Sequence, residues 1–241
     1  MNERLASLSP EQKRELLKRL LEKKRQARES SIPPSTEVPQ PAEFPLSAGQ
    51  QALWFAFQEN PSATAYNVFL PSRFRSPIDL DKLRRATESL VARHASLRTT
   101  FGEEPSNGSP IQRVAKSGHT EFRVVDCRGW DEEKRKRHVL AETHRSFDLT
   151  NGPLLRIACF QAATDDTVVI ATTHHIVVDF WSLVMLMTEV EQLYLGKPLP
   201  APQNQYRDFV LAQETLLRSD SGAAQREHWM RELAGICPRL E

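Results

Sequence analysis

Hydrophobic residues recur at two different spacings along this chain, and each spacing predicts a different kind of element. Over 80–94 they return every three or four residues, which predicts an amphipathic helix. Its apolar face holds Leu83, Ala86, Leu90 and Val91. Patterns of this kind predict helices over 47–59, 80–94, 131–145, 179–195, 206–218 and 223–233. Short apolar or alternating runs predict strands over 66–74, 97–101, 111–115, 121–125, 154–161 and 167–173. Because helices and strands alternate, we expect an α/β fold with helices layered on a sheet.

The first 28 residues have a basic, amphipathic pattern of their own. Nine Lys and Arg stand against four Asp and Glu there, and Ser9, Pro10 and Gln12 fit a capping box at the start of a helix. The helix has a short apolar stripe of Leu16, Leu17, Leu20 and Leu21. A helix of this length is marginal in water. We therefore expect either a solvated leader or a helix that docks on its own domain or on another polypeptide.

A proline-rich segment separates this helix from the rest of the chain. It holds Pro33, Pro34, Pro39 and Pro41 among Ser, Thr and Gln, without apolar periodicity. That composition predicts an extended, semi-stiff linker. The sequence thus divides into a leader helix over 1–28, a linker over 29–44 and a globular part over 45–241.

Composition and charge exclude several classes of protein. The 241 residues are 39% hydrophobic and 26% charged, as in ordinary globular proteins, and the net charge of +1 gives no general electrostatic reason to bind nucleic acid or a membrane. Cys127, Cys159 and Cys237 are widely spaced and form no C-x-x-C pair, which predicts reduced thiols. Because no apolar run suits a secretory signal or a membrane span, we expect a cytoplasmic protein.

The segment 173–182 holds the residues best suited to carry out a chemical reaction. His174 and His175 close an apolar predicted strand, and Asp179 follows where a helix begins. Since side chains on a strand alternate between faces, one imidazole should look into a cleft while the other packs inside. A neutral imidazole suits proton transfer at physiological pH, and a carboxylate at a helix start can cap free N–H groups or hold a cation.

Two other interpretations of this segment stay open on the residues alone. An adjacent histidine pair can be purely structural or solvated. His174, His175 and Asp179 also offer three potential metal ligands, although neighbouring strand residues on opposed faces make joint ligation by both histidines awkward. We expect no metal, because no Cys pair or His-x3-His spacing supports one elsewhere.

Five segments, taken in order, resemble the condensation domain of nonribosomal peptide synthetases. They are 46–55, 93–101, 147–156, the His-His-x-x-x-Asp segment with Trp181 and Ser182, and 206–209. The resemblance implies a chloramphenicol acetyltransferase-like α/β sandwich. The family's domain is a two-lobed pseudo-dimer, and the motifs of its C-terminal lobe have no counterpart before Glu241. This chain therefore resembles the N-terminal lobe alone, preceded by a linker or docking helix.

The resemblance also implies an activity and its partners. Condensation domains form an amide bond between an acyl or peptidyl thioester and an aminoacyl acceptor, in nonribosomal peptide or hybrid polyketide biosynthesis. Both substrates arrive on the 4'-phosphopantetheine arms of carrier proteins, so no directly bound cofactor is expected. Expected partners are these carriers, the C-terminal lobe with downstream synthetase domains, and an upstream synthase reached through the N-terminal helix. Half a substrate tunnel implies weak or no turnover from this chain alone.

Carried onto this sequence, the resemblance assigns roles to individual residues. His175 is expected to face the cleft and either take the amine proton or position the amine and stabilise the intermediate by hydrogen bonding. His174 is expected to point inward in a supporting role. Asp179 orients the loop through a cap or an ion pair, with Arg98 as its candidate partner. Arg98 could equally be a solvated residue at a strand edge.

The three residues after Asp179 are expected to line or support the substrate channel. Phe180 stands where the family usually has Gly, so its ring could narrow the acceptor approach or its backbone could be restricted. Trp181 is expected to pack, and Ser182 to form local hydrogen bonds. Two alternative functions remain: a free-standing acyltransferase that acts on a hydroxyl or a small amine, and a non-catalytic fragment that only binds carriers.

Overall fold

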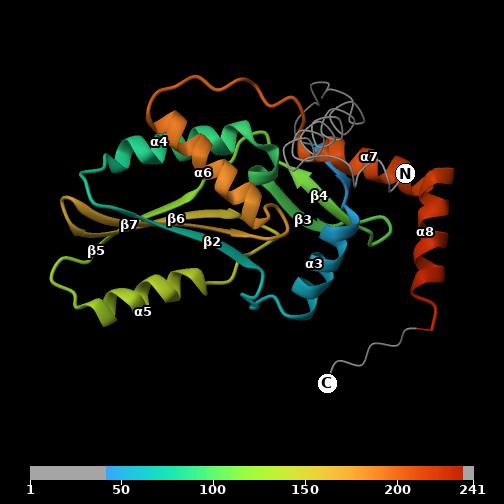
Figure 1. The fold of residues 1–241 in the computed structure, drawn as a ribbon, viewed down its shortest axis with the longest axis horizontal. Coiled ribbons are helices and arrows are strands. Elements are labelled where there is room, and N and C mark those ends of the chain that lie inside the picture. The colour runs from blue at the N-terminus through green and yellow to red at the C-terminus, as the bar shows by residue number, and fades with distance from the viewer. Residues whose placement is uncertain (1–41, 236–241) are drawn as a thin grey trace, which may run out of the picture.

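The described part of the chain, residues 42–235 of a computed structural model, contains two sheets flanked by helices (Figure 1). In chain order the elements are β1 (Ala42–Pro45), α3 (Ala48–Glu59), β2 (Asn67–Phe74), α4 (Leu80–Arg93), the 3-10 helix η1 (Ala95–Arg98), β3 (Thr99–Glu103), β4 (Pro110–Val114), β5 (Glu121–Asp126), α5 (Glu132–Thr143), β6 (Leu155–Ala163), β7 (Asp166–His174), α6 (Phe180–Tyr194), α7 (Tyr206–Arg218) and α8 (Asp220–Glu232). The predicted leader helix over 1–28 and Cys237 lie outside the described residues.

The larger sheet has the strand order β2-β7-β6-β5, and only β5 and β6 run parallel. Helices α4 and α6 cover one face of this sheet and α5 covers the other (Figure 1). The two central strands are therefore shielded on both faces, which explains why consecutive residues of β6 and β7 are buried rather than alternate ones. The strand that ends in the histidine pair thus lies at the centre of the core.

The packing of α4 against α6 and the sheet confirms the predicted apolar face of the 80–94 helix. Leu83, Ala86, Leu90 and Val91 are all buried there. They pack with Leu183, Leu186 and Val190 of α6 and with inward residues of β6 and β7. Fully burying one leucine of this kind stabilises the fold by about 1.5–3 kcal/mol. The same packing fixes the first turn of α6 next to the end of β7.

The smaller sheet has the order β1-β4-β3 and carries two differences from the predicted elements. The predicted strand over 97–101 begins later, because Ala95–Arg98 form a 3-10 turn that buries Leu97 before β3 starts at Thr99. In addition, Ala42 opens β1 and pairs with Val114, so residues 42–44 belong to a sheet rather than to the linker over 29–44. Pairing of their backbone groups with β4 outweighs the local linker-like composition.

The last two helices meet at a corner, and α8 extends away from the rest of the molecule (Figure 1). Tyr206 ties α7 to the body through a hydrogen bond between its hydroxyl and the Ser47 hydroxyl at 2.8 Å. By contrast, Trp229 and Met230 of α8 are exposed. Within residues 42–235, no helix combines the length and apolar composition needed to cross a bilayer.

Candidate functional site

The histidine pair lies in a tight turn between β7 and α6. Strand β7 ends at His174, and the backbone N–H of His175 donates to the Tyr66 carbonyl at 2.8 Å just before the start of β2. Helix α6 begins at Phe180, and the Asp179 carboxylate accepts the backbone N–H of Ser182 at 2.6 Å. An aspartate at this position satisfies one of the free N–H groups of the first helical turn. The turn is thus fixed at both of its ends.

His174 points into the protein, as predicted, and only 4% of its surface is exposed. Its Nδ1 accepts the backbone N–H of Ile176 at 3.1 Å, so the ring proton must be on Nε2. Burial, together with a smaller effect of the neighbouring His175, lowers the pKa of His174 to about 4. At physiological pH this imidazole is therefore neutral, and it holds the turn rather than exchanging protons.

His175 faces the opposite way and is exposed. Its Nδ1 lies 3.1 Å from the carbonyl oxygen of Val178. A carbonyl can only accept, so Nδ1 carries a proton, and it is Nε2 that has the free lone pair in the neutral form of the ring. The turn therefore presents the imidazole of His175 on the exposed side, opposite to that of His174.

Asp179 is a helix cap, and it is not paired with Arg98 in the described residues. Hydrogen bonds from the backbone and side chain of Ser182 lower the pKa of Asp179, with a smaller contribution from His175. Arg98 instead donates through Nε to the Val91 carbonyl at 3.1 Å and through Nη1 to the Ala115 carbonyl. These bonds tie the end of α4 to the end of β4. The predicted ion pair between Asp179 and Arg98 is therefore wrong, because the N–H groups of Arg98 donate to backbone carbonyls instead.

The start of α6 presents an apolar surface beside His175. Phe180 is 57% exposed and Trp181 is 71% exposed, with Met185 one turn further along. The prediction that Trp181 packs is therefore wrong in this structure. No non-glycine residue among those described has a positive φ, so Phe180 causes no backbone restriction, and only its ring distinguishes it from Gly. Ser182 forms the local hydrogen bonds that we predicted.

Gln50 reaches the same turn from a distant part of the sequence. Its Nε2 donates to the Ile176 carbonyl at 3.1 Å, while its Oε1 accepts the backbone N–H of Ser47 at 3.0 Å. Gln112 of β4 donates to Gln50 Oε1 at 2.9 Å, so both amides are buried and bonded. Sequence reasoning used Gln50 only as part of a helix motif. Gln50 forms a capping box with Ser47 at the start of α3, but no local sequence pattern indicated its contact with the turn.

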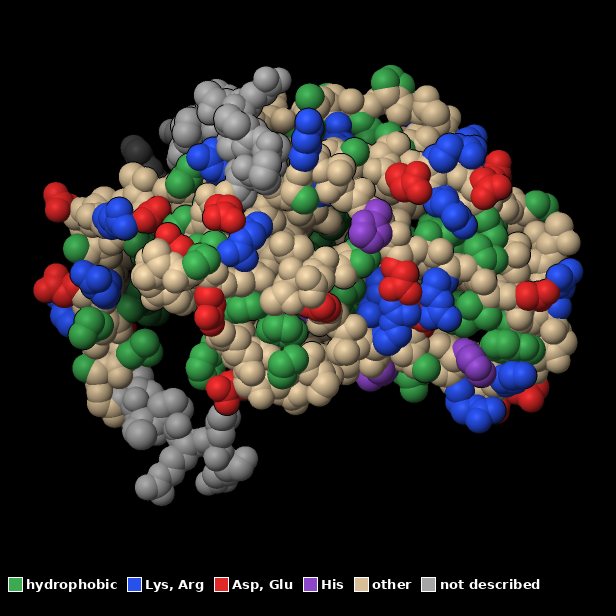
Figure 2. Space-filling model, turned by 180° about the vertical axis from the view of Figure 1, so that it is seen from behind, with side chains coloured by type: hydrophobic (Ala, Val, Ile, Leu, Met, Phe, Trp, Pro, Cys, Tyr) green, Lys and Arg blue, Asp and Glu red, His purple; other side chains and the backbone are tan. Residues whose placement is uncertain are grey.

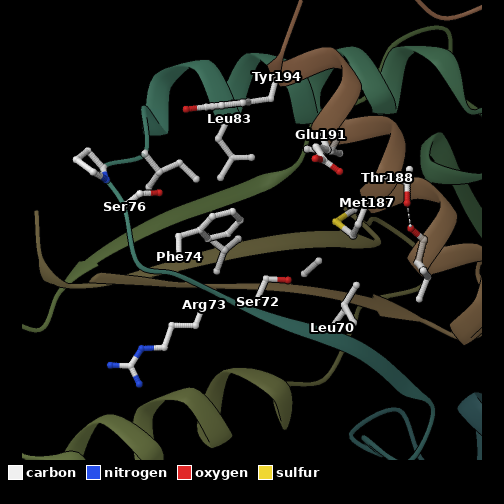
Figure 3. A pocket seen from close by; sticks show the side chains of 16 residues that line it. Leu70, Ser72, Arg73, Phe74, Ser76, Leu83, Met187, Thr188, Glu191 and Tyr194 are labelled. Carbon is white, nitrogen blue, oxygen red and sulfur yellow. Dashed lines mark hydrogen bonds between the residues drawn. The ribbon is translucent and has the colours of Figure 1, made fainter. Parts of the chain in front are cut away.

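A separate apolar cavity of about 540 Å³ lies between β2, β7, α4 and α6 (Figure 3). Phe74, Leu83, Met187 and Tyr194 line it, and Arg73 at its rim points away toward Asp166. None of the lining residues belongs to the histidine motif. The cavity is lined mainly by apolar side chains, with Glu191 and Tyr194 among the polar ones, and it contains no residue of the histidine turn.

Charged patches, metal ligands and thiols elsewhere in the described residues are the other features that could mark a site. Basic and acidic side chains are interspersed over the face seen in Figure 2. Among residues 42–235, no group of three or more His, Cys, Asp and Glu side chains could hold a metal ion. Burial raises the pKa of the Cys159 thiol to about 12, and burial also raises that of Cys127, which makes both poor nucleophiles.

Family membership follows from comparison with known proteins. The model of the Condensation domain family matches residues 40–241, and the chain belongs to that family. Cyclosporin synthetase simA of Tolypocladium inflatum is 36% identical over 208 residues, which cover 85% of this chain and 1% of that protein. Isonitrile lipopeptide synthase of Mycobacterium tuberculosis is 33% identical over 228 residues, which cover 88% of this chain and 9% of that protein. The chain thus spans only a small part of the length of these relatives.

Solved structures show the same fold. The starter condensation domain of rhizomide synthetase RzmA gives a TM-score of 0.70 at 19% identity, over 82% of this chain and 51% of that chain. The condensation domain from monacolin K polyketide synthase MokA gives a TM-score of 0.72 at 24% identity, over 83% of this chain and 45% of that chain. The predicted chloramphenicol acetyltransferase-like fold is confirmed, and a match to about half of each domain is consistent with a single lobe.

Proposed function

We propose that this chain is the N-terminal lobe of a condensation-type acyltransferase that joins a carrier-bound acyl or peptidyl thioester to a carrier-bound aminoacyl amine. The observation that supports the proposal best is the turn after β7. It holds His174 neutral and buried, while His175 is exposed and its Nδ1 lies 3.1 Å from the Val178 carbonyl oxygen. Relatives at 30% identity or more carry the names of a cyclosporin synthetase and a lipopeptide synthase, which fits an amide-forming reaction.

The proposed amide-forming reaction requires one basic nitrogen next to the attacking amine. The acceptor amine attacks the thioester carbonyl, a C–N bond forms, and the C–S bond breaks as the tetrahedral intermediate collapses. The amine proton passes to His175 Nε2 and from there to the departing sulfur. Alternatively, His175 hydrogen-bonds the amine and the intermediate while the proton leaves by another route. Because a thioester is already activated, holding amine and carbonyl in contact supplies much of the rate.

The substrates define the partners of this site. Carrier proteins would present both thioesters on 4'-phosphopantetheine arms, so the chain itself needs no tightly bound cofactor. A mutant of one structural neighbour, the starter condensation domain of rhizomide synthetase RzmA, was solved in complex with C8-CoA. We further propose that the basic segment over 1–28 docks on an upstream synthase, and that Phe180 narrows the approach of the acceptor.

A second lobe is part of the proposal. Phe180, Trp181 and Met185 form exposed apolar surface beside the reactive nitrogen, which leaves the reaction open to water. We expect the 241-residue chain alone to give weak or no product from two loaded carriers. Mass spectrometry of the carrier-bound products measures this directly. A robust condensation rate from the isolated chain would contradict the requirement for a second lobe.

The decisive variant is His175→Ala in the full-length protein. It should remove most product formation from two loaded carriers, while carrier binding, measured by fluorescence anisotropy, persists. His119→Ala is a matched control, because His119 is an exposed histidine on a distant loop. Unchanged product yield in His175→Ala would overturn the assignment of His175. If free alcohols or small amines replaced the loaded acceptor equally well, the free-standing acyltransferase would be the better description.

A further inference from the structure

Arg156 is a buried cation on the same face of the larger sheet as His174. It lies opposite Thr172 on β7, two residues before His174, and only 4% of its surface is exposed. Nη1 donates to the Ser146 carbonyl at 3.0 Å and Nη2 to the Arg145 carbonyl at 2.6 Å. Burying a charge is costly unless hydrogen bonds compensate it, and here both bonds go to one loop.

Arg156 remains charged at neutral pH. Burial and, to a smaller extent, the nearby Arg145 lower the pKa of Arg156, the carboxylates of Glu142 and Glu121 oppose this, and the resulting pKa is about 10. A guanidinium with a pKa of about 10 is almost entirely protonated at pH 7. The planar fork of donors is therefore intact when it bonds the loop.

A ring stack connects this cation to the histidine turn. The guanidinium lies over the ring of Phe147, 3.7 Å from its centroid. Phe147 in turn meets the imidazole of His174 edge-on, with centroids 6.3 Å apart and an interplanar angle of 81°. His174 then bonds the backbone N–H of Ile176 inside the turn. Each step is a direct contact, so a shift of Arg156 is transmitted to the turn that presents His175.

The loop is held from a second strand as well. Asn67 of β2 lies opposite His174 in the β2–β7 register, and its Nδ2 donates to the carbonyls of Thr143 and Arg145 at 2.8 and 2.9 Å. The Arg145 carbonyl therefore receives bonds from both Asn67 and Arg156. Two strands that flank β7 thus fix one loop, and that loop presses Phe147 on His174.

We propose that Arg156 is a positioning residue for the proposed acyl transfer, acting through Phe147 and His174 to keep the Nε2 of His175 free and outward-facing. The proposal rests on the function assigned to His175 above. Its physical basis is the planar fork of arginine, which bonds two carbonyls and stacks on a ring at the same time. Lysine has the charge but neither the plane nor the fork, so it cannot replace arginine here.

The test compares Arg156→Lys and Arg156→Met with the unchanged protein. The first readout is independent of activity: long-range ¹H–¹⁵N NMR of the ¹⁵N-histidine-labelled 241-residue chain, which shows the ring nitrogen that carries each proton. We expect His175 to be protonated on Nδ1 in the unchanged chain. In both variants it should move toward the tautomer mixture of free imidazole, because the bond to the Val178 carbonyl is no longer held.

The second readout is condensation by the full-length protein. Both variants should lower kcat by about 10- to 100-fold, the size expected for a misplaced catalytic group, with KM for the loaded carriers little changed. Arg123→Met is the matched control, because Arg123 pairs with Glu142 at 2.8 Å but does not stack on Phe147. It should leave both the His175 tautomer and kcat as they were.

Folding is monitored by circular dichroism, so that a global effect is recognised. If Arg156→Met does not fold, Phe147→Leu carries the test, since it removes the stack but keeps the bonds of Arg156 to the loop. Folded Arg156 or Phe147 variants with an unchanged His175 tautomer would overturn the proposal. The outcome is separable from that of the proposed function: retained activity in His175→Ala would reject the function, whereas the tautomer would still report on Arg156.

Discussion

Replacing Asp179 separates its role as a helix cap from its charge. Asp179→Ala removes the acceptor of the Ser182 N–H and leaves a free donor at the start of α6. Loss of such a cap costs about 0.5–2 kcal/mol, and because Asp179 is exposed, we expect a value near 1 kcal/mol. For a chain of this size, that corresponds to a decrease in Tm of about 2–4 °C. Asp179→Asn keeps the acceptor and should cost only a few tenths of a kcal/mol.

The pH dependence supplies an independent check of the same reasoning. The hydrogen bonds of Ser182 place the folded-state pKa of Asp179 below its ordinary value. The ionised carboxylate therefore stabilises the fold at every pH above that ordinary value, and this contribution is lost as the pH falls through the folded-state pKa. The stability difference between the unchanged chain and Asp179→Ala should be full at pH 7 and shrink below about pH 4.

Urea unfolding at pH 7 and at pH 3, followed by circular dichroism, measures both effects. Equal destabilisation by Asp179→Ala and Asp179→Asn at pH 7 would refute the cap and point to the charge alone. A difference between Asp179→Ala and the unchanged chain that stays constant down to pH 3 would refute the pKa argument.

Three further predictions follow from buried groups. Leu90→Ala should lower the free energy of unfolding by about 2–5 kcal/mol, whereas Leu140→Ala at an exposed position should change it by less than about 0.5 kcal/mol, both measured by urea titration. His174 should titrate near pH 4 in a histidine NMR titration, and since its pKa is lowered on folding, stability should decrease as the pH falls from about 6.5 toward 4; a flat profile would contradict its burial. Gln50→Leu leaves the Ile176 carbonyl without its donor and should cost about 1–3 kcal/mol in thermal unfolding, and a loss no larger than that of an exposed control would show that this bond is unimportant.

The spacing of hydrophobic residues predicted an element well where burial is confined to one face, as in α4, or continuous along the strand, as in β7. The buried face of α4 and the apolar run of β7 are both patterns that local spacing reveals, and both were located within a residue or two. The 3-10 turn over Ala95–Arg98 was missed, because a four-residue turn that buries only Leu97 has no period of its own. Similarly, β1 was assigned to the linker because its partner strand β4 lies far away in the sequence.

The candidate site likewise has features that the sequence predicted and features that it did not. The inward and outward directions of His174 and His175 followed from the strand that precedes them, and the role of Asp179 as a cap followed from the helix that comes after it. The partner of Arg98 could not be predicted, since backbone carbonyls leave no mark in the sequence. The exposure of Trp181 was missed for a related reason: an apolar side chain predicts burial without saying which surface covers it.

The hydrogen bond from Gln50 to the Ile176 carbonyl has a consequence for how the protein forms. It joins positions 126 residues apart, so it can close only after the chain has been synthesised past the end of β7. Contacts of such long sequence separation require loop closure first and therefore form late in folding. The turn after β7 should thus be among the last parts of this domain to form, and a nascent chain that ends before β7 would contain α3 but not the turn that its Gln50 binds.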